Sequence, residues 1–466
     1  MRRSFVVGLA LGVTSLALAE QPESRTRKSL ERAVDTVVIT GSDGLGRRLL
    51  RTPIGELRAY ACRGGFMTPI QYQIDERDQE GRFVWTSGPS DRRTQDHDRG
   101  LLDTNDELLV LARDVGDRAT AASLAQIEGH AGIQEIELTD PMDGGKAWIY
   151  LARFPGPQRP SRPDLDLVDL QIRRLNDEEA VHTWTGEHFQ FNNARSPNNA
   201  VRATWAGLAP QGKRGFRRAR NILDSTQVRA VASFMWVTVV RQSNDIKVRT
   251  GGLIDGPIRI VAENRMEVYL ALGLWVSAPE SYVILWTNRV SMPTNADCPV
   301  NLDESDESNY ALGVDMRREV RGFKFYNSHN RQPVVIDGQP SAAERRLDRS
   351  YPDWNCVFGP DGAMLSKFVC PDRLRSAPGS GLLYVDDVNY QRDDDAEGIE
   401  FEPGAVGYHG YYVNMQGLPK GTYPGDYVVW YLPPPFRPGD EKPYLDEYER
   451  PIAAVATEHD GAGRVK

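Results

Sequence analysis

The sequence predicts a mainly β protein, with antiparallel strands in a β-sandwich and few short helices. The clearest evidence is residues 226–290, where β-branched and aromatic runs alternate with turn-forming residues. Two of these runs, QVRAVASFMWVTVV and MEVYLALGLWV, exceed the usual strand length, which is typical of broad, twisted sheets. Helical signals are sparse, and only residues 121–128 and 342–348 favour short helices.

Further strands are expected on both sides of this stretch. The N-terminal third has apolar runs at 36–39, 70–74, 82–85, 107–112 and 147–152. Residues 70–74 and 82–85 have the form of two strands around the polar turn DERDQEG. The C-terminal part adds runs at 321–326, 334–336, 382–385, 408–413 and 426–432.

Composition limits the classes of function. The chain has 466 residues, 40% of them hydrophobic, which is enough for a sizeable core. Its formal net charge of −9 disfavours a nucleic-acid partner, because neutralising phosphates requires an excess of Lys and Arg. The motifs G-x-S-x-G, G-x-G-x-x-G and the P-loop are absent, so the sequence indicates no catalytic residues.

The first residues predict export. Two arginines, an apolar run from Phe5 to Leu18 and the small residues around Ala19 form the pattern of a signal peptide at 1–19, cleaved after Ala19. The apolar run is too short for a membrane anchor, and no later segment predicts a transmembrane helix. Arg2-Arg3 also resembles a twin-arginine signal, so both export routes stay open. We therefore expect a periplasmic or extracellular protein.

A proline-rich segment suggests how the exported chain is divided. Residues 155–166, PGPQRPSRPDLD, contain four prolines and are expected to be a linker. It would separate an N-terminal β-rich domain at 20–154 from a large β-sandwich domain at 167–458. The last residues, 459–466, are expected to be a disordered tail.

Four cysteines in an exported chain favour two disulfides. Three pairings of Cys62, Cys298, Cys356 and Cys370 are possible, and sequence alone does not decide among them. Cys356 and Cys370 enclose a short loop, which favours that pair and leaves Cys62 for Cys298. A metal site is the alternative, but no C-x-x-C spacing supports it.

An acidic loop, DHDRGLLDTNDE at 96–107, suggests a structural Ca²⁺ site. Calcium prefers several oxygen ligands in a flexible loop, and the loop offers the carboxylates of four acidic residues and one backbone carbonyl. The loop departs from an EF-hand in its glycine position and in the strand-like segment that follows. The alternative is a solvated acidic turn that opens a strand. The candidate ligands are Asp96, Asp98, Leu102, Asp103 and Glu107.

Aromatic residues gather near the C-terminus. Aromatic faces stack on sugar rings, and tyrosine hydroxyls can orient a sugar by hydrogen bonds. The competing interpretation is packing within the β core, because strands favour aromatic residues. The candidate ligand-binding residues are Tyr408, His409, Tyr411, Tyr412 and Trp430.

The segments QYQIDERDQEGRFV and LLDTNDELLVLARD resemble a pattern in uncharacterised secreted bacterial all-β proteins. The strand-rich plan is similar to the β-supersandwich of mutarotase-like and polysaccharide-lyase-associated domains. The resemblance implies a supersandwich fold and a glycan-related context, and it assigns no catalytic residue.

Together these observations suggest an exported protein that binds or processes a carbohydrate polymer. A non-catalytic periplasmic protein whose broad sheets dock a protein partner is the alternative. A further alternative, an accessory subunit of an exported cofactor-containing enzyme, depends on the twin-arginine-like start. Whether the protein is an enzyme stays open.

Overall fold

The computed structural model describes residues 26–89, 96–157, 159–174, 180–195, 202–209, 216–242, 245–269, 275–304, 306–390 and 404–457. The expected signal peptide and C-terminal tail lie outside them. The described part is mainly β with antiparallel strand pairs, which confirms the predicted fold class. None of its helices is both long enough and apolar enough to cross a lipid bilayer.

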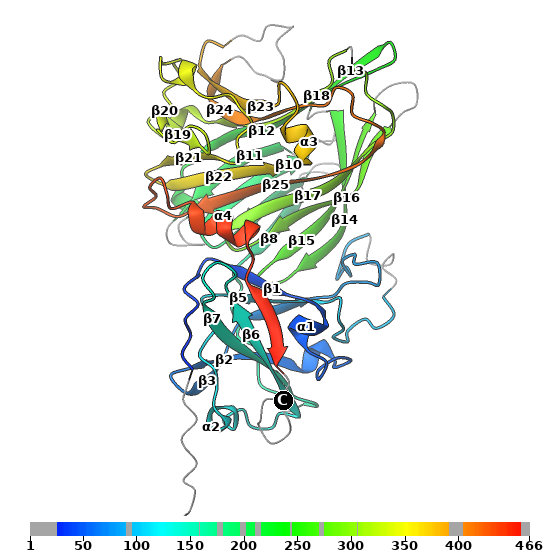
Figure 1. The fold of residues 1–466 in the computed structure, drawn as a ribbon, viewed down its shortest axis with the longest axis vertical. Helices are drawn as coiled ribbons and strands as arrows, with labels where there is room; N and C mark the ends of the chain where they lie inside the picture. Colours follow the sequence, from blue (N-terminus) through cyan, green and yellow to red (C-terminus); the bar gives the residue numbers. More distant parts are fainter. Residues whose placement is uncertain are drawn as a thin grey trace, which may run out of the picture.

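The N-terminal part forms a unit of two sheets, at the bottom of Figure 1. Apolar side chains from both sheets, among them Val110 and Ile149, form its core. The smaller sheet has the order β1 (Thr36–Ile39), β5 (Glu107–Leu111) and β4 (Tyr72–Asp75). The larger has the order β26 (Ala453–Thr457), β6 (Gly132–Thr139), β7 (Lys146–Arg153), β2 (Leu57–Arg63) and β3 (Phe66–Pro69).

The last strand among the described residues belongs to this N-terminal unit. β26 pairs with β6, from Ala453 opposite Thr139 to Thr457 opposite Glu135. Figure 1 shows it running down from α4 (Lys442–Glu449) into the lower unit. The described residues between 154 and 168 contain no helix or strand, and beyond them the chain enters the upper unit. The expected boundaries stay a prediction, to which the topology adds this return of the C-terminus.

Two broad sheets form the upper unit. The five-stranded sheet has the order β13 (Val237–Gln242), β12 (Leu223–Phe234), β18 (Asn309–Met316), β24 (Ala405–Asn414) and β23 (Gly381–Asp387). The nine-stranded sheet has the order β14 (Ile246–Asp255), β15 (Ile260–Tyr269), β16 (Trp275–Leu285), β17 (Arg289–Cys298), β25 (Gly421–Leu432), β22 (Gly362–Val369), β21 (Asn355–Gly359), β19 (Lys324–Asn327) and β20 (Val334–Val335).

A four-stranded sheet contributes to the core between these two sheets. Its aromatic side chains reach the nine-stranded sheet, where Phe189 stacks on Tyr431 with ring centroids 4.4 Å apart. Its strand order is β11 (Arg202–Leu208), β10 (Phe189–Arg195), β9 (Ala180–Thr185) and β8 (Asp169–Arg174). The space between the broad sheets is therefore filled by large rings in this region.

Helices are few and short among the described residues. The expected helix at 121–128 is shorter, because α2 covers Ala121–Leu124, and the one at 342–348 is a 3-10 turn at Glu344–Arg346. The others are α1 (Gly41–Leu45), α3 (Asp372–Arg375), α4, and 3-10 turns at Ile54–Glu56, Phe216–Arg218 and Arg318–Val320.

Three predicted strands are wrong. The run at 227–240 is a hairpin, in which β12 ends at Phe234, Met235 and Trp236 form the turn, and β13 begins at Val237. No glycine, proline, asparagine or aspartate marks this turn, so no local turn signal was present. The run at 266–276 also belongs to two paired strands, because β15 ends at Tyr269 and β16 begins at Trp275. Residues 82–85 form no strand, although Phe83, Val84 and Trp85 are buried. Their apolar character reflects packing in the core.

A buried charge network joins the two units. Arg259, just before β15 of the upper unit, forms ion pairs with Asp75 of β4 and Glu107 of β5. The Gln73 side chain accepts hydrogen bonds from the backbone amides of Ile258 and Arg259, at 3.0 and 2.9 Å. The Arg259 side chain is only 3% exposed, so water has little access to its guanidinium group and the carboxylates are its main partners. The network therefore fixes β4 and β5 against the start of β15.

We expect Arg259→Met to destabilise the protein by about 3–5 kcal/mol, because it leaves the buried Asp75 carboxylate without its cationic partner. Urea unfolding followed by tryptophan fluorescence measures the change. The control is Lys146→Met, which breaks the exposed ion pair with Glu137 and is expected to cost about 1 kcal/mol or less. Equal effects of the two substitutions would contradict a structural role for the buried network.

Candidate functional site

A cavity of about 460 Å³ lies between the two broad sheets of the upper unit. This volume falls in the range of pockets that hold small organic ligands. Its walls come from β12, β13, β18 and β24 on one side and from β14–β17, β22 and β25 on the other. The cavity therefore occupies the position that a sandwich normally fills with side chains.

The lining follows the period-two alternation of β-strands. Every second side chain of a strand points to the same face, so one face of each sheet can be almost entirely apolar. On β12 the alternating lining residues are Thr226, Val228, Ala230 and Ala232, and Leu223 also reaches the cavity. On β17 they are Val290, Met292, Thr294, Ala296 and Cys298, and Asp297 departs from the alternation.

Small side chains leave the space open. Ala230 and Ala232 on β12, together with Ala296 on β17, contribute only methyl groups to the lining. Val228 and Ala230 are half-buried although they lie on an inner face, because they border the cavity. A close-packed core would need larger residues here, since protein interiors otherwise contain few voids.

Few charged side chains reach the cavity. The charged residues of the lining are Arg241, Asp297 and Asp426. Asp297 accepts a hydrogen bond from the Thr422 hydroxyl at 2.6 Å, and Asp426 accepts one from the Tyr448 hydroxyl at 2.9 Å. Arg241, on the edge strand β13, donates to the Val240 carbonyl at 2.7 Å and supplies the positive charge of the lining.

The uncharged polar groups of the lining are also suited to an apolar occupant. Ser281 and Thr294 pair their hydroxyls with each other at 3.0 Å. Burial raises the pKa of Tyr310 to about 12, and the nearby Cys370 adds to the shift, so this phenol is neutral at physiological pH. The cavity is therefore a mainly apolar space whose polar groups are a few neutral side chains, the two hydrogen-bonded aspartates and one arginine.

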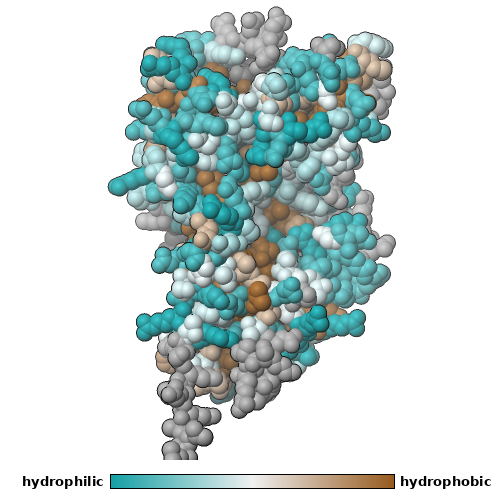
Figure 2. Space-filling view, in the orientation of Figure 1, coloured by the Kyte–Doolittle hydropathy of each residue, from teal (hydrophilic) through white to brown (hydrophobic). Residues whose placement is uncertain are grey.

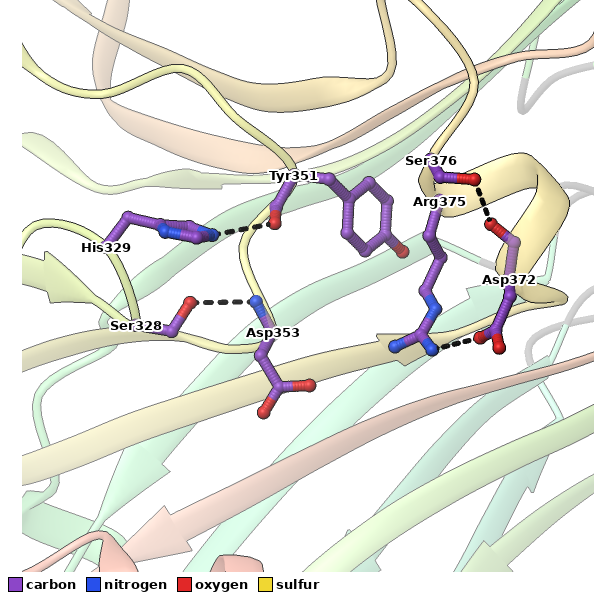
Figure 3. Close-up of a pocket in the computed structure, with 7 residues that line it drawn as sticks. All are labelled: Ser328, His329, Tyr351, Asp353, Asp372, Arg375 and Ser376. Atoms are coloured by element: carbon purple, nitrogen blue, oxygen red, sulfur yellow. Dashed lines mark hydrogen bonds and ion pairs between the residues drawn. The ribbon is translucent and has the colours of Figure 1, made fainter.

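A second pocket is open and polar. It has a volume of about 390 Å³, and Figure 3 shows its side chains between the end of β19 and α3. The Ser328 hydroxyl accepts a hydrogen bond from the Asp353 amide at 2.8 Å, and Arg375 pairs with Asp372. The lining residues are Ser328, His329, Tyr351, Asp353, Asp372, Arg375 and Ser376.

The predicted aromatic ligand site lies in the core. Tyr408, His409, Tyr411 and Trp430 are at most 1% exposed, and Tyr412 is half-buried. The Tyr411 hydroxyl donates to the Ser366 carbonyl at 2.9 Å, inside the sandwich. Burial lowers the pKa of His409 to about 4, against a smaller opposite effect of its hydrogen bond with Gly407. These rings pack against protein, and we do not include them in the proposed site.

Part of the predicted calcium loop comes together. Asp96, Asp98 and Asp103 lie close enough that the charge of Asp98 raises the pKa of both neighbours, in addition to a larger effect of burial. Among the described residues, however, no group of three or more His, Cys, Asp and Glu side chains is arranged to hold a metal ion. The calcium site stays a prediction from the sequence.

The other two predicted calcium ligands have protein partners. Glu107 forms ion pairs with Arg77 and Arg259; burial alone would raise its pKa, but the two arginines together lower it. The Leu102 carbonyl accepts a hydrogen bond from the Arg51 amide at 2.7 Å, and the Leu102 side chain is fully buried. Glu107 therefore belongs to the network that joins the two units.

The expected disulfides are absent from the structure, where all four cysteines are free. Cys62 lies in the core of the N-terminal unit, whereas Cys298 lines the cavity of the upper unit. Cys356 packs beside Trp430 and Leu365, and Cys370 belongs to a different cluster that borders the cavity. The predicted pairs are thus wrong because their members lie in separate parts of the core.

The sequence analysis missed the cavity residues. Alternating apolar residues on β12 indicate an inward face, but they do not show how far away the facing sheet lies. The small residues Ala230, Ala232 and Ala296 were a weak signal, because alanines are equally common in close-packed cores.

Comparison with known proteins identifies no family. No family model matches the chain, and no curated protein matches it. Among solved structures, it is similar to an alpha-mannosidase from Enterococcus faecalis V583, with a TM-score of 0.41 and 9% identity over 94% of this chain. It is also similar to a protein in glycosyl hydrolase family 38 from Enterococcus faecalis, with a TM-score of 0.39 and 9% identity over 94% of this chain.

The chain spans about half the length of these two neighbours, 48% of each. Both TM-scores are low, so neither neighbour indicates a function for this chain.

Asp106 makes the stability of the acidic loop depend on pH. Burial, aided by the charges of Asp103 and Glu76, raises its pKa from 3.8 to about 7, although two backbone amides oppose the shift. An acid whose pKa is raised by folding holds its proton more tightly in the folded state. Its contribution to stability is therefore complete below pH 4 and is lost as the pH rises toward 7.

We expect Asp106→Asn to reduce the fall in stability between pH 4 and pH 7, because the side chain no longer ionises. Urea unfolding at several pH values measures the slope. The lost hydrogen-bond acceptor lowers stability at every pH and leaves the slope unaffected. A slope identical to that of the original protein would contradict the raised pKa of Asp106.

Proposed function

We propose that this protein binds an apolar or amphiphilic small molecule, such as one with a hydrocarbon chain, between its two broad sheets. The observation that carries the proposal is the cavity of about 460 Å³ with a mainly apolar lining. Transfer of a hydrocarbon chain from water into such a cavity is favourable in proportion to the apolar surface removed from water. It also restores the packing contacts that the small lining residues leave unmade.

The position of Arg241 favours a ligand with an acidic end. This side chain lies on edge strand β13 and is half-buried, so a carboxylate beside it would be partly protected from water. Hydrogen bonds between such charged groups are stronger than those between neutral groups. A fatty acid combines this head group with an apolar chain.

The predicted signal peptide makes the periplasm or the cell exterior the compartment that we propose. Hydrocarbon-chain compounds need a carrier in such aqueous compartments, because they are poorly soluble in water. A carrier role needs no catalytic residues, which agrees with the lack of a catalytic motif in the sequence. Binding of a protein partner by the broad sheets stays an alternative.

We expect Ala230→Phe to weaken binding of 11-(dansylamino)undecanoic acid by about tenfold or more, because the new ring occupies space that the probe needs. Fluorescence titration of the purified chain measures the affinity. The control is Ala342→Phe, which places the same ring on the exposed surface and should leave binding unchanged. No binding of the probe to the original protein would refute the proposed function.

A second candidate function is carbohydrate binding at the open polar pocket. The pocket brings the carboxylates of Asp353 and Asp372 together with Arg375 and the hydroxyl of Ser376, and such groups can hydrogen-bond to sugar hydroxyls. The Asp353 carboxylate accepts a hydrogen bond from the Lys367 ammonium group at 2.6 Å, which holds it in place. The pocket is therefore where we place the carbohydrate contact expected from the sequence.

If this candidate is correct, Arg375→Gln lowers affinity for a bound glycan by about tenfold, because a charged hydrogen bond is lost. A glycan array identifies the ligand, and titration of that ligand measures the affinity. Arg345→Gln, on the exposed surface outside the pocket, is the control. Failure of the original protein to bind any neutral or acidic glycan would eliminate this candidate.

A further inference from the structure

The turn between β12 and β13 has an unusual composition. Phe234 pairs with Val237, so Met235 and Trp236 alone connect the strands. Met235 has a φ of 56°, a left-handed conformation that glycine adopts without strain. Two-residue hairpin turns usually place Gly, Asn or Asp at such a position. Folding alone would therefore favour a different residue from the methionine that occurs here.

This turn is also exposed and apolar. Met235 is 68% exposed and Trp236 is 79% exposed, which makes Trp236 the most exposed of the large hydrophobic residues described. Figure 2 shows brown, hydrophobic surface at the upper right, where β13 lies in Figure 1. A strained turn that exposes two large apolar side chains indicates a surface that contacts something other than water.

Apolar side chains continue from this turn to the cavity. Phe234 and Val239 form a small buried cluster directly behind it, against which Val237 and Val300 pack. Val239 and Val300 also line the cavity. The exposed turn and the proposed ligand site are therefore two ends of one apolar region, carried by the same hairpin.

We propose that Met235 and Trp236 insert into the surface of a zwitterionic lipid bilayer, so that the cavity exchanges its ligand with the membrane. This inference deepens the proposed function and rests on it, because it names the source of the apolar ligand. Tryptophan is enriched where proteins meet the head-group region of membranes, since its ring is apolar but has a polar N–H. Hydrocarbon-chain ligands are concentrated in the same layer.

The charges beside the turn favour a zwitterionic bilayer over an anionic one. The Asp303 amide donates to the Ser233 carbonyl at 2.9 Å, and the Ser233 hydroxyl donates to the Glu307 carbonyl at 2.6 Å. These bonds hold an acidic segment beside the hairpin, and its described acidic residues are Asp303, Glu304, Asp306 and Glu307. Anionic lipids would repel this segment.

The test is co-flotation of the purified chain with phosphatidylcholine vesicles. We expect the double variant Met235→Gly/Trp236→Ser to bind the vesicles about tenfold more weakly or worse, because it removes both large apolar side chains of the turn. Glycine suits the backbone at 235, so this variant keeps its hairpin. The control is Phe66→Ser, which removes a side chain that is 70% exposed in the N-terminal unit.

A second measurement separates this inference from the proposed function. Titration with 11-(dansylamino)undecanoic acid in the absence of vesicles should give the same affinity for the double variant as for the original protein. Transfer of that probe from vesicles to the protein should become slower in the double variant. Loss of probe binding in Ala230→Phe without loss of flotation would show that the two sites act separately.

Four outcomes would overturn the inference. One is that the original protein does not float with the vesicles, and another is that the double variant floats as well as the original protein. Equal loss of flotation in Phe66→Ser would show that adsorption is non-specific. A dimer that dissociates in the double variant, seen by sedimentation, would assign the turn to contact between two copies of the chain instead of a membrane.

Discussion

The reach of side chains across the gap between two broad sheets determines most of this structure. Each strand sends every second side chain into the gap, so the residues on the inner faces must fill it. Where Phe189 stacks on Tyr431 the gap is filled, and the core there is close-packed. Where alanines face the same gap, a cavity remains. The sandwich therefore contains both a packed core and a cavity, and the size of the inner-face residues decides which of the two occurs in each region.

A second feature is that the upper unit is held in a fixed position on the N-terminal unit. Arg259 achieves this from the loop before β15, through carboxylates on two strands of the other unit. Arg289 and Glu447 make a comparable pair where α4 crosses the junction, and Glu447 also accepts a hydrogen bond from the Thr36 amide at 3.0 Å. Buried charges are costly unless they are paired. Separating the two units would therefore break these buried ion pairs, which stabilise the contact between the units.

The fold class could be predicted from the sequence because strands carry local signals. The run at 36–39 is β1 as expected, and the apolar run at 107–112 contains β5. Local signals failed where tertiary packing decided the outcome. The run at 227–240 contains a turn that only the pairing of β12 with β13 explains, and Phe83 is buried without belonging to a strand.

The candidate site was harder to predict, because a site depends on distances between segments far apart in the sequence. Tyr411 and Trp430 have the composition of a sugar-binding surface, yet both point into the core. In the acidic loop, Asp98 lies near Asp96 and Asp103, but Glu107 has cationic partners from other segments, Arg77 and Arg259. Cysteine count suggested pairing, whereas pairing requires the thiols to meet, and no local pattern contains that information.

The return of the chain to its own beginning affects how the protein is made. One edge of β6 is paired only after β26 has been synthesised. The Gln134 side chain also donates a hydrogen bond to the Thr457 carbonyl, 323 residues further along the chain. Until the ribosome has synthesised residues 453–457, this sheet has an open edge, which can pair with other chains. Synthesis that stops early would therefore yield an aggregation-prone product even if the first 150 residues were intact, and the final strand acts as the closing step of assembly.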